Sequence, residues 1–274
     1  MAVRKKTSVP AKVKNTNALA KQSINSLMAQ DSEVSTGFEN MNADDLAIPF
    51  ITLLQSNSPQ VKKGPQKIAG AEEGDIYNTV TQEVFKDTIT VVPCAYQKSW
   101  VEWVPRNSGG GFVRQHPDSS ILDSCEHIVD ENGRRDVLPN GNHIVVTAYH
   151  YCLLVKDNGD FDRAVISFTS TQLKKSRKWN TQMLNQKIEV KGKKVTPPMF
   201  SHTYTLAPVE ESNDRGSWIG WEITNPKIIQ DPDLYVMARK FHADVSAGEV
   251  KTAPPPEEAG VSSDAGANDE EELF

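Results

Sequence analysis

The segment Ile144-Val145-Val146-Thr147-Ala148-Tyr149-His150-Tyr151-Cys152-Leu153-Leu154-Val155 decides the fold class. It is a long, mostly apolar run, and the polar stretch Asp157-Asn158-Gly159-Asp160 that follows is typical of a tight turn. Residues 163–168 are then predicted as a second strand, so that the two segments form the clearest hairpin in the chain.

Similar short strands are predicted on both sides of this hairpin. They cover residues 76–80, residues 88–104 across Pro93, and residues 201–206 and 218–224, with a polar loop at 210–216 joining the last two. The spacing predicts a mainly β protein, either an OB-like β-barrel or a compact β-sandwich, with one or two short helices and disordered termini.

Two helices are predicted among the strands. In the first, Leu46, Phe50, Leu53 and Leu54 have helical spacing, and Asp44 or Asp45 is placed to cap the start. The second follows Thr169 or Ser170 as the cap. Its apolar side is formed by Leu173, Asn180, Met183 and Leu184.

Composition divides the chain into three parts. Residues 1–42 form a basic arm without an acid before Asp31, which we expect to be largely disordered. Residues 43–242 form the β domain. Residues 243–274 are expected to form a disordered linker, with the run Pro254-Pro255-Pro256, and an acidic tail.

Charge is distributed very unevenly along the 274 residues. From Glu249 onward eight acids stand against Lys251 alone, which gives the C-terminal segment −7 and leaves +1 for the rest of a chain whose net charge is −6. Three widely spaced cysteines indicate free thiols and a reducing compartment. No apolar run approaches the length that spans a membrane, and no hydrophobic segment follows Arg4-Lys5-Lys6 as in a secretory signal. A cytoplasmic protein without a membrane partner is therefore expected.

The chain ends in Asp269-Glu270-Glu271-Glu272-Leu273-Phe274. Four successive carboxylates repel one another and leave only two apolar side chains to bury, so this tail cannot fold alone. It is suited to docking in a basic groove that ends in a pocket for the Phe ring. The alternative is an acidic terminus that serves only solubility.

A strongly basic block elsewhere in the chain has the opposite charge to this tail. Residues 172–195 carry eight lysines and arginines against Glu189 only, a net charge of +7. We expect the tail to occupy this block until a stronger polyanion, such as a phosphate backbone, displaces it. The alternative is a solvated helix face followed by a lysine-rich hairpin.

Aromatic residues lie close to cations in two places. Binding a single strand without reading its sequence requires a cationic track and rings on which bases stack. Tyr96 and Trp100 share one face of a predicted strand, whereas Trp103 points to the other, so only one set lines a groove. Trp179, inside the basic helix, is expected at the surface. The candidate single-strand contacts are Lys98, Trp100, Trp103, Arg106, Lys174, Lys175, Arg177, Lys178, Trp179, Lys191, Lys193 and Lys194.

Other chemistry has weaker support. The loop Gly109-Gly110-Gly111 lacks the Gly-Lys-Ser/Thr ending of a phosphate-binding loop. The pairs Cys125/His127 and His150/Cys152 are spaced more tightly than zinc knuckles, so no metal or other cofactor is predicted. Catalytic motifs such as Gly-x-Ser-x-Gly are absent, and a protein that is not an enzyme is expected.

Several segments together resemble a family of tailed-bacteriophage single-stranded DNA-binding proteins. They are Asp45-Leu46-Ala47-Ile48-Pro49-Phe50 through Ser58-Pro59-Gln60-Val61, Gly74-Asp75-Ile76-Tyr77-Asn78-Thr79-Val80-Thr81, Trp103-Val104-Pro105-Arg106 with Gly109-Gly110-Gly111, Val137-Leu138-Pro139-Asn140-Gly141, and the most distinctive, Ser170-Thr171-Gln172-Leu173-Lys174-Lys175-Ser176-Arg177-Lys178-Trp179-Asn180. The resemblance covers roughly residues 40–240. It implies a replication or recombination protein that coats single strands through an OB-like barrel, and it carries no catalytic residues across.

The leading hypothesis is a phage protein of the host cytoplasm that coats single-stranded DNA during replication, recombination and repair. Its acidic tail would contact replication proteins such as a DNA polymerase or a helicase-primase. A strand-annealing recombinase and an interaction protein without a DNA role are the alternatives, a nuclease is the least favoured, and the oligomeric state, including a homo-oligomer, stays open.

Overall fold

The computed structural model describes residues 26, 28, 37–41, 45–130, 133–214, 216–250, 252–253 and 255–256. The chain divides into two units, Met1–Asp45 and Leu46–Phe274. Most of the predicted arm (1–42) and the whole of the acidic tail lie outside the described residues. The second unit contains all the strands named below.

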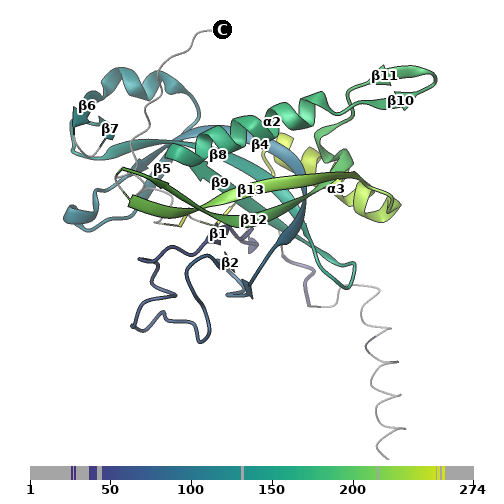
Figure 1. Ribbon diagram of the computed structural model, residues 1–274, viewed down its shortest axis with the longest axis horizontal. Coiled ribbons are helices and arrows are strands. Elements are labelled where there is room, and N and C mark those ends of the chain that lie inside the picture. Colours follow the sequence, from purple (N-terminus) through teal and green to yellow (C-terminus); the bar gives the residue numbers. More distant parts are fainter. Residues whose placement is uncertain are drawn as a thin grey trace, which may run out of the picture. The chain divides into compact units, whose positions relative to one another are not determined.

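Eight strands form the main sheet, in the order β13-β12-β4-β8-β7-β6, with β5 paired to β4 and β9 paired to β8 (Figure 1). All the pairings in this sheet are antiparallel. The predicted mainly β class is confirmed, and the predicted hairpins at 144–168 and 201–224 are present. The strands are β4 (Ile89–Trp103), β5 (Phe112–His116), β6 (Glu126–Asp130), β7 (Gly133–Val137), β8 (His143–Val155), β9 (Phe161–Thr169), β12 (His202–Asn213) and β13 (Gly216–Ile228).

Strand β4 runs through a proline because a bulge accommodates it. The register against β8 shifts between Pro93 and Ala95, which leaves Cys94 as the extra residue. The bulge reverses the alternation of side chains, since Ile89 and Val91 pack in one core and Ala95 and Val101 in the other. Downstream of the bulge, even-numbered residues therefore share the face that odd-numbered residues hold upstream.

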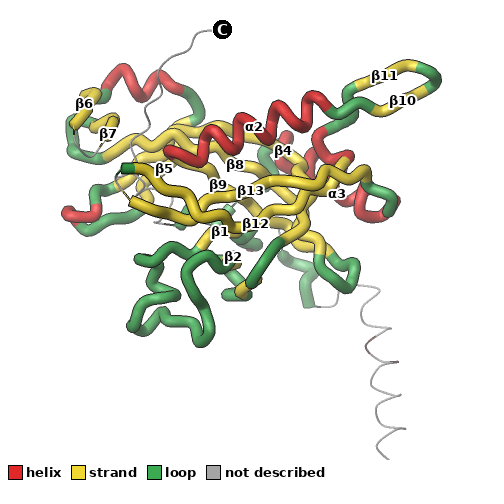
Figure 2. The backbone as a smooth tube through the Cα atoms, viewed as in Figure 1, coloured by secondary structure: helices red, strands yellow, loops and turns green. Residues whose placement is uncertain are grey.

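Each face of the sheet packs against one helix (Figure 2). Helix α2 (Leu173–Asn185) contributes Trp179 and Met183 to the core on one face, called here the first core. Helix α3 (Pro232–Ser246) contributes Leu234, Ala238 and Phe241 to the core on the other face, the second core. A sheet buried on both faces, with few helices, agrees with the predicted sandwich-like arrangement.

The segment before β2 is extended, so the helix predicted from Leu46, Phe50 and Leu53 is wrong. Its strand β1 (Ile51–Leu53) pairs with β2 (Ile76–Asn78), which pairs with β3 (Val84–Phe85). Residues 48–54 are all buried or half-buried. Continuous burial removes the alternation that distinguishes a strand from a helix in the sequence.

This extended segment connects two edges of the main sheet. The amide of Val165 on β9 donates to the carbonyl of Pro49 at 2.9 Å. The side chain of Gln55 bonds both the amide and the carbonyl of Ile219 on β13, each at 2.9 Å. The segment therefore bridges β9 and β13 on the side where the first core lies.

The folded part extends beyond residue 242, contrary to the expected linker. Helix α3 continues to Ser246, and it starts with Asp231 as a side-chain cap and a proline in the first turn. Farther along, the amide of Ala253 donates to the carbonyl of Ile48 at 3.1 Å, and Val250 packs against the second core. Among the described residues, no helix is both long and apolar enough to cross a membrane.

Candidate functional site

Helix α2 has one buried and one cationic side. Ser176, Trp179 and Met183 are buried, whereas Lys174, Arg177 and Lys178 are exposed. The helix is long enough for both sides to be continuous over three turns. The predicted basic helix is therefore present, and these three cations are on its exposed side.

A two-stranded hairpin lies beyond the end of α2 (Figure 1), and it carries further lysines. Strand β10 (Ile188–Val190) pairs with β11 (Lys193–Val195). Lys191 and Gly192 connect them with φ of 50° and 75°, the positive values of a type I′ turn. Lys191, Lys193 and Lys194 are exposed, as a DNA contact requires.

Lys175 is half-buried and forms an ion pair with the sheet. Its Nζ lies 2.8 Å from Oε1 of Glu211 on β12. Oε2 of Glu211 accepts from Gln172 at 2.8 Å and from the indole of Trp218 at 3.1 Å. Burial acts to raise the pKa of Glu211, but the hydrogen bonds from Lys175 and Gln172 outweigh it and the pKa is lowered. Lys175 thus anchors the helix.

Tyr96, Lys98 and Trp100 lie on the face of β4 that α2 shares. Tyr96 is 40% exposed, and Nζ of Lys98 lies 5.1 Å from the centroid of the Trp100 ring. Burial raises the pKa of Tyr96, while the charge of Arg177 acts in the opposite direction. The ring centroid of Tyr96 lies 5.2 Å from that of His150, on which Trp179 of α2 stacks, so Tyr96 borders the helix that carries Arg177. The structure brings two rings and two cations from separate segments to one surface.

Trp179 is fully buried, so its predicted surface position is wrong. Its ring stacks on His150 with centroids 4.5 Å apart and an interplanar angle of 17°, and Phe168 and Tyr204 meet it edge-on. Trp179 lies one turn from both Ser176 and Met183 on the inner side. The largest apolar side chain of the helix occupies the core, whereas Leu184, assigned to the apolar side, is 66% exposed.

Trp103 is also a core residue, with 4% exposure and an edge contact to Phe112. It packs with Val101 in the second core, so it cannot stack on a base in this conformation. Arg106 is exposed, in the short helical turn Arg106–Ser108 beyond the end of β4. The three glycines that follow it all have positive φ, which only glycine adopts readily.

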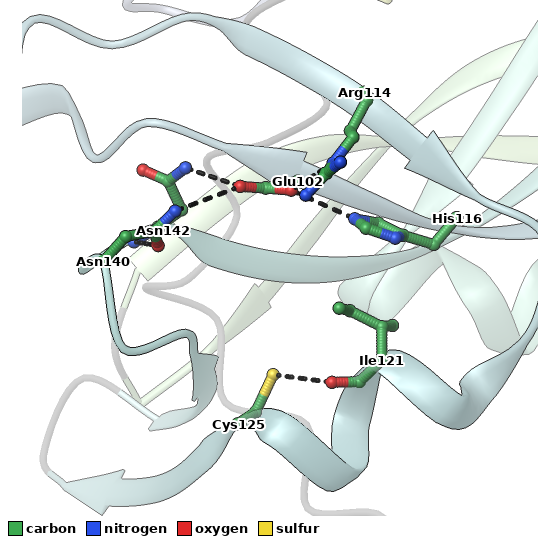
Figure 3. A network of polar contacts seen from close by, with 7 residues as sticks. All are labelled: Glu102, Arg114, His116, Ile121, Cys125, Asn140 and Asn142. Atoms are coloured by element: carbon green, nitrogen blue, oxygen red, sulfur yellow. Dashed lines mark hydrogen bonds and ion pairs between the residues drawn. The ribbon is translucent and has the colours of Figure 1, made fainter.

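A buried carboxylate, that of Glu102, lies on the face of β4 that also holds Tyr96 and Trp100 (Figure 3). Glu102 is 1% exposed, and its oxygens accept from Arg114 at 2.9 Å, from His116 at 3.0 Å and from Asn142 at 2.6 Å. Burial acts to raise the pKa of Glu102, but these bonds, with a longer one from Asn140, lower the pKa to about 2. The network joins β4, β5 and the loop before β8.

Arg114 is a candidate contact that sequence reasoning missed. Its side chain is 66% exposed although its Nε is held by Glu102. The pairings of Trp100 with His116 and of Glu102 with Arg114 place it beside the aromatic surface. An arginine oriented through Nε keeps its terminal nitrogens in a fixed fork that suits phosphate. The available signal was the polar run Arg114-Gln115-His116 shortly after the glycine loop.

The other chemical motifs do not assemble. His150 is buried beneath α2, and His127 is exposed and bonded to Asp136 at 2.5 Å. Within the described ranges, no group of three His, Cys, Asp or Glu side chains is placed to hold a metal ion, and the three cysteines are free.

A cleft of about 460 Å³ lies on the opposite face, between β4, β5 and the segment after α3. Gln97, Gln115, Tyr151 and Phe112 line it, together with Val245, Gly248, Val250, Thr252, Ala253 and Pro255. None of these residues is charged, so the cleft does not extend the cationic surface.

Comparison with known proteins gives one assignment. No curated protein and no solved structure matches the chain. A family model described as Pam3 phage gp34-like protein matches residues 14–251. That range contains the whole main sheet, α2 and the basic hairpin. The chain therefore belongs to the Pam3 phage gp34-like protein family.

Proposed function

We propose that this phage protein binds and coats single-stranded DNA, without strong sequence preference, during DNA replication, recombination and repair in the host cytoplasm. The observation that carries the proposal is the surface formed by Tyr96, Lys98, Trp100 and Arg177. Sequence-tolerant binding of a single strand needs rings beside cations on one accessible surface. This surface combines both, and the lysines of α2 and the hairpin extend its charge.

Each group has a distinct task in this proposal. Bases stack on Tyr96 and Trp100, because both rings are at least partly exposed. Phosphates contact Lys98, Arg114, Lys174, Arg177 and Lys178, together with the lysines of the hairpin. Phosphate neutralisation releases counterions, so affinity falls as salt rises. No bond is made or broken, and we propose a binding protein rather than an enzyme.

The experiment is a fluorescence titration of the full chain with poly(dT) over a series of salt concentrations. Quenching of tryptophan emission with an affinity that falls linearly on a logarithmic salt scale is expected. Trp100→Ala is expected to remove much of the quenching, while the buried Trp179 continues to emit. Binding that is absent at micromolar protein, or that salt does not weaken, contradicts the proposal.

The acidic tail adds a second, separable part to the proposal. Asp269 to Glu272 would compete with DNA for the lysines of α2 and the hairpin, and Leu273 and Phe274 would enter a pocket on a replication partner such as a polymerase or helicase-primase. Deleting residues 269–274 is then expected to tighten DNA binding and to abolish partner contact. The matched control neutralises the four acids as amides but keeps Leu273 and Phe274. Unchanged DNA affinity in both variants refutes the competition.

A further inference from the structure

The hairpin β10–β11 has two chemically different faces. Cross-strand pairs join Ile188 to Val195 and Val190 to Lys193, and alternate pairs lie on the same face. One face is therefore aliphatic with a lysine near the turn. The pair Glu189 and Lys194 is on the other face, beside the exposed Lys191 of the turn.

Part of the aliphatic face is uncovered in the part of the chain that the structure describes, because Ile188 is half-buried whereas Val190 and Val195 are exposed. Val190 is 45% exposed and Val195 39% exposed. None of the three apolar clusters formed by the described residues includes them or Ile188. An isolated two-stranded hairpin is marginally stable, so an unpaired aliphatic face on a projecting hairpin indicates contact with something else.

The hairpin is nevertheless anchored at its base. Nζ of Lys187 donates to Oγ1 of Thr196, and to the carbonyl of Leu184 in the last turn of α2 at 3.4 Å. At the other end of the hairpin, the two-residue turn of Lys191 and Gly192 restricts the backbone conformation. The hairpin is thus a short ribbon that extends the direction of α2 rather than a loose loop (Figure 1).

The hairpin carries cations for phosphates but lacks the rings that hold the bases of a single strand. Residues 186–197 contain no aromatic side chain on which a base could stack. They do contain Lys187, Lys191, Lys193 and Lys194 against Glu189 only, which complements a polyanion. A two-stranded ribbon fits the major groove of a duplex, where lysines reach phosphates and aliphatic groups contact thymine methyls.

We propose that the hairpin β10–β11 contacts double-stranded DNA next to the single strand that α2 and β4 hold, so that the protein recognises single-strand/duplex junctions. This inference rests on the proposed function for the single-strand part only. Lys191, Lys193 and Lys194 bind the duplex phosphates, and Val190 and Val195 meet the base edges or the last base pair.

The test compares three DNA ligands by fluorescence anisotropy at one fixed salt concentration. They are an oligo(dT), the same oligo(dT) attached to a duplex, and the blunt duplex alone, with 3′ and 5′ tails measured separately. The full chain is expected to bind one tailed duplex about tenfold more tightly than the oligo(dT), as a few added phosphate contacts would give.

Two variants locate the effect. Lys191→Gln with Lys193→Gln and Lys194→Gln is expected to remove the preference for the tailed duplex and to weaken oligo(dT) binding to a smaller extent, because a duplex presents the phosphates of two strands to these exposed lysines. Val190→Ser with Val195→Ser is expected to reduce the preference without changing the net charge. The control, Lys174→Gln with Lys178→Gln, is expected to weaken both ligands equally.

The outcomes separate the two proposals. If the full chain binds neither tailed duplex more tightly than oligo(dT), or if the hairpin variants weaken both ligands equally, the junction inference is overturned. Hairpin variants that bind every DNA normally also overturn it, and they leave a protein partner as the occupant of the aliphatic face. If the chain prefers a tailed duplex but does not bind oligo(dT), the coating function fails while the junction inference stands.

Discussion

Lys175 and Glu211 form an ion pair with 2.8 Å between Nζ and Oε1, and this pair attaches the first turns of α2 to strand β12. Gln172 reinforces the attachment, since its amide also bonds the backbone N–H of Trp221 at 3.0 Å. A β-carbon at Gly220 would lie 2.3 Å from Oε2 of Glu211, so a glycine leaves room for the network. The cations of α2 therefore have two different roles.

The two roles predict that substitutions of neighbouring lysines affect different properties, stability for one and DNA binding for the other. Lys175→Gln is expected to lower the free energy of unfolding by about 1 kcal/mol, because Glu211 loses a charged partner. Lys174→Gln, on the exposed side, is expected to leave that free energy within about 0.5 kcal/mol while it weakens poly(dT) binding. Urea denaturation and the titration together check this. Equal stability losses in the two variants would contradict the assignment.

Substitutions of the two tryptophans Trp179 and Trp100 are likewise predicted to affect stability and DNA binding, respectively. Trp179→Ala is expected to lower the free energy of unfolding by about 3–5 kcal/mol, because it leaves a cavity between His150, Phe168 and Tyr204. Trp100→Ala is expected to weaken DNA binding by about 1–3 kcal/mol for each base that stacks on it. Denaturation and titration of both variants decide the matter, and a stable Trp179→Ala protein would be incompatible with this packing.

Glu102 predicts a loss of stability in acid. Its pKa is lowered to about 2 from a reference of 4.5, so the unfolded chain takes up a proton at higher pH than the folded one. Its contribution is complete above about pH 4.5 and is lost as the pH falls toward 2, up to about 3 kcal/mol in total.

Unfolding of the full chain is therefore measured in urea at several pH values between these limits. Glu102→Gln is expected to be less stable near neutral pH and to have a flatter pH profile below pH 4.5. Glu126→Gln, at an exposed position on β6, serves as the control. Parallel profiles for the Glu102 variant and the unmodified chain would exclude this role.

Because of His150, the free energy of unfolding is predicted to depend on pH over a higher range than the one set by Glu102. Burial lowers its pKa from 6.5 to about 3, so the imidazole is neutral in the folded state and bonds the Ser176 hydroxyl at 2.8 Å. Its contribution is complete above about pH 6.5 and declines as the pH falls toward 3, by at most about 1.4 kcal/mol per pH unit. His150→Phe keeps a ring against Trp179 and cannot titrate. It is expected to flatten the profile between pH 6.5 and 4.5, where an unchanged slope would assign the effect to other groups such as His143 and His202.

Local patterns were sufficient for much of the fold. The strands β4, β8 and β9 and the helix α2 were predictable, because each has a long apolar run, a turn signal or a segregated charge pattern. Helix α3 was also accessible in principle, since Pro232 follows a capping Asp231 and Leu234, Ala238 and Phe241 are spaced at helical intervals. The extended segment around Phe50 was not, because burial on all sides leaves no period to detect.

The sequence by itself determined the mainly β class and the separation of a +7 block from a −7 C-terminal segment, since both depend only on residue type and order. Only the tertiary structure decided which tryptophans are accessible and which lysines are paired. The bulge at Pro93 places Trp100 on the face shared with α2, and packing on His150 buries Trp179. Those outcomes depend on contacts between segments far apart in the chain, such as Lys175 with Glu211 and Glu102 with Asn142. Such contacts form only when the sheet assembles.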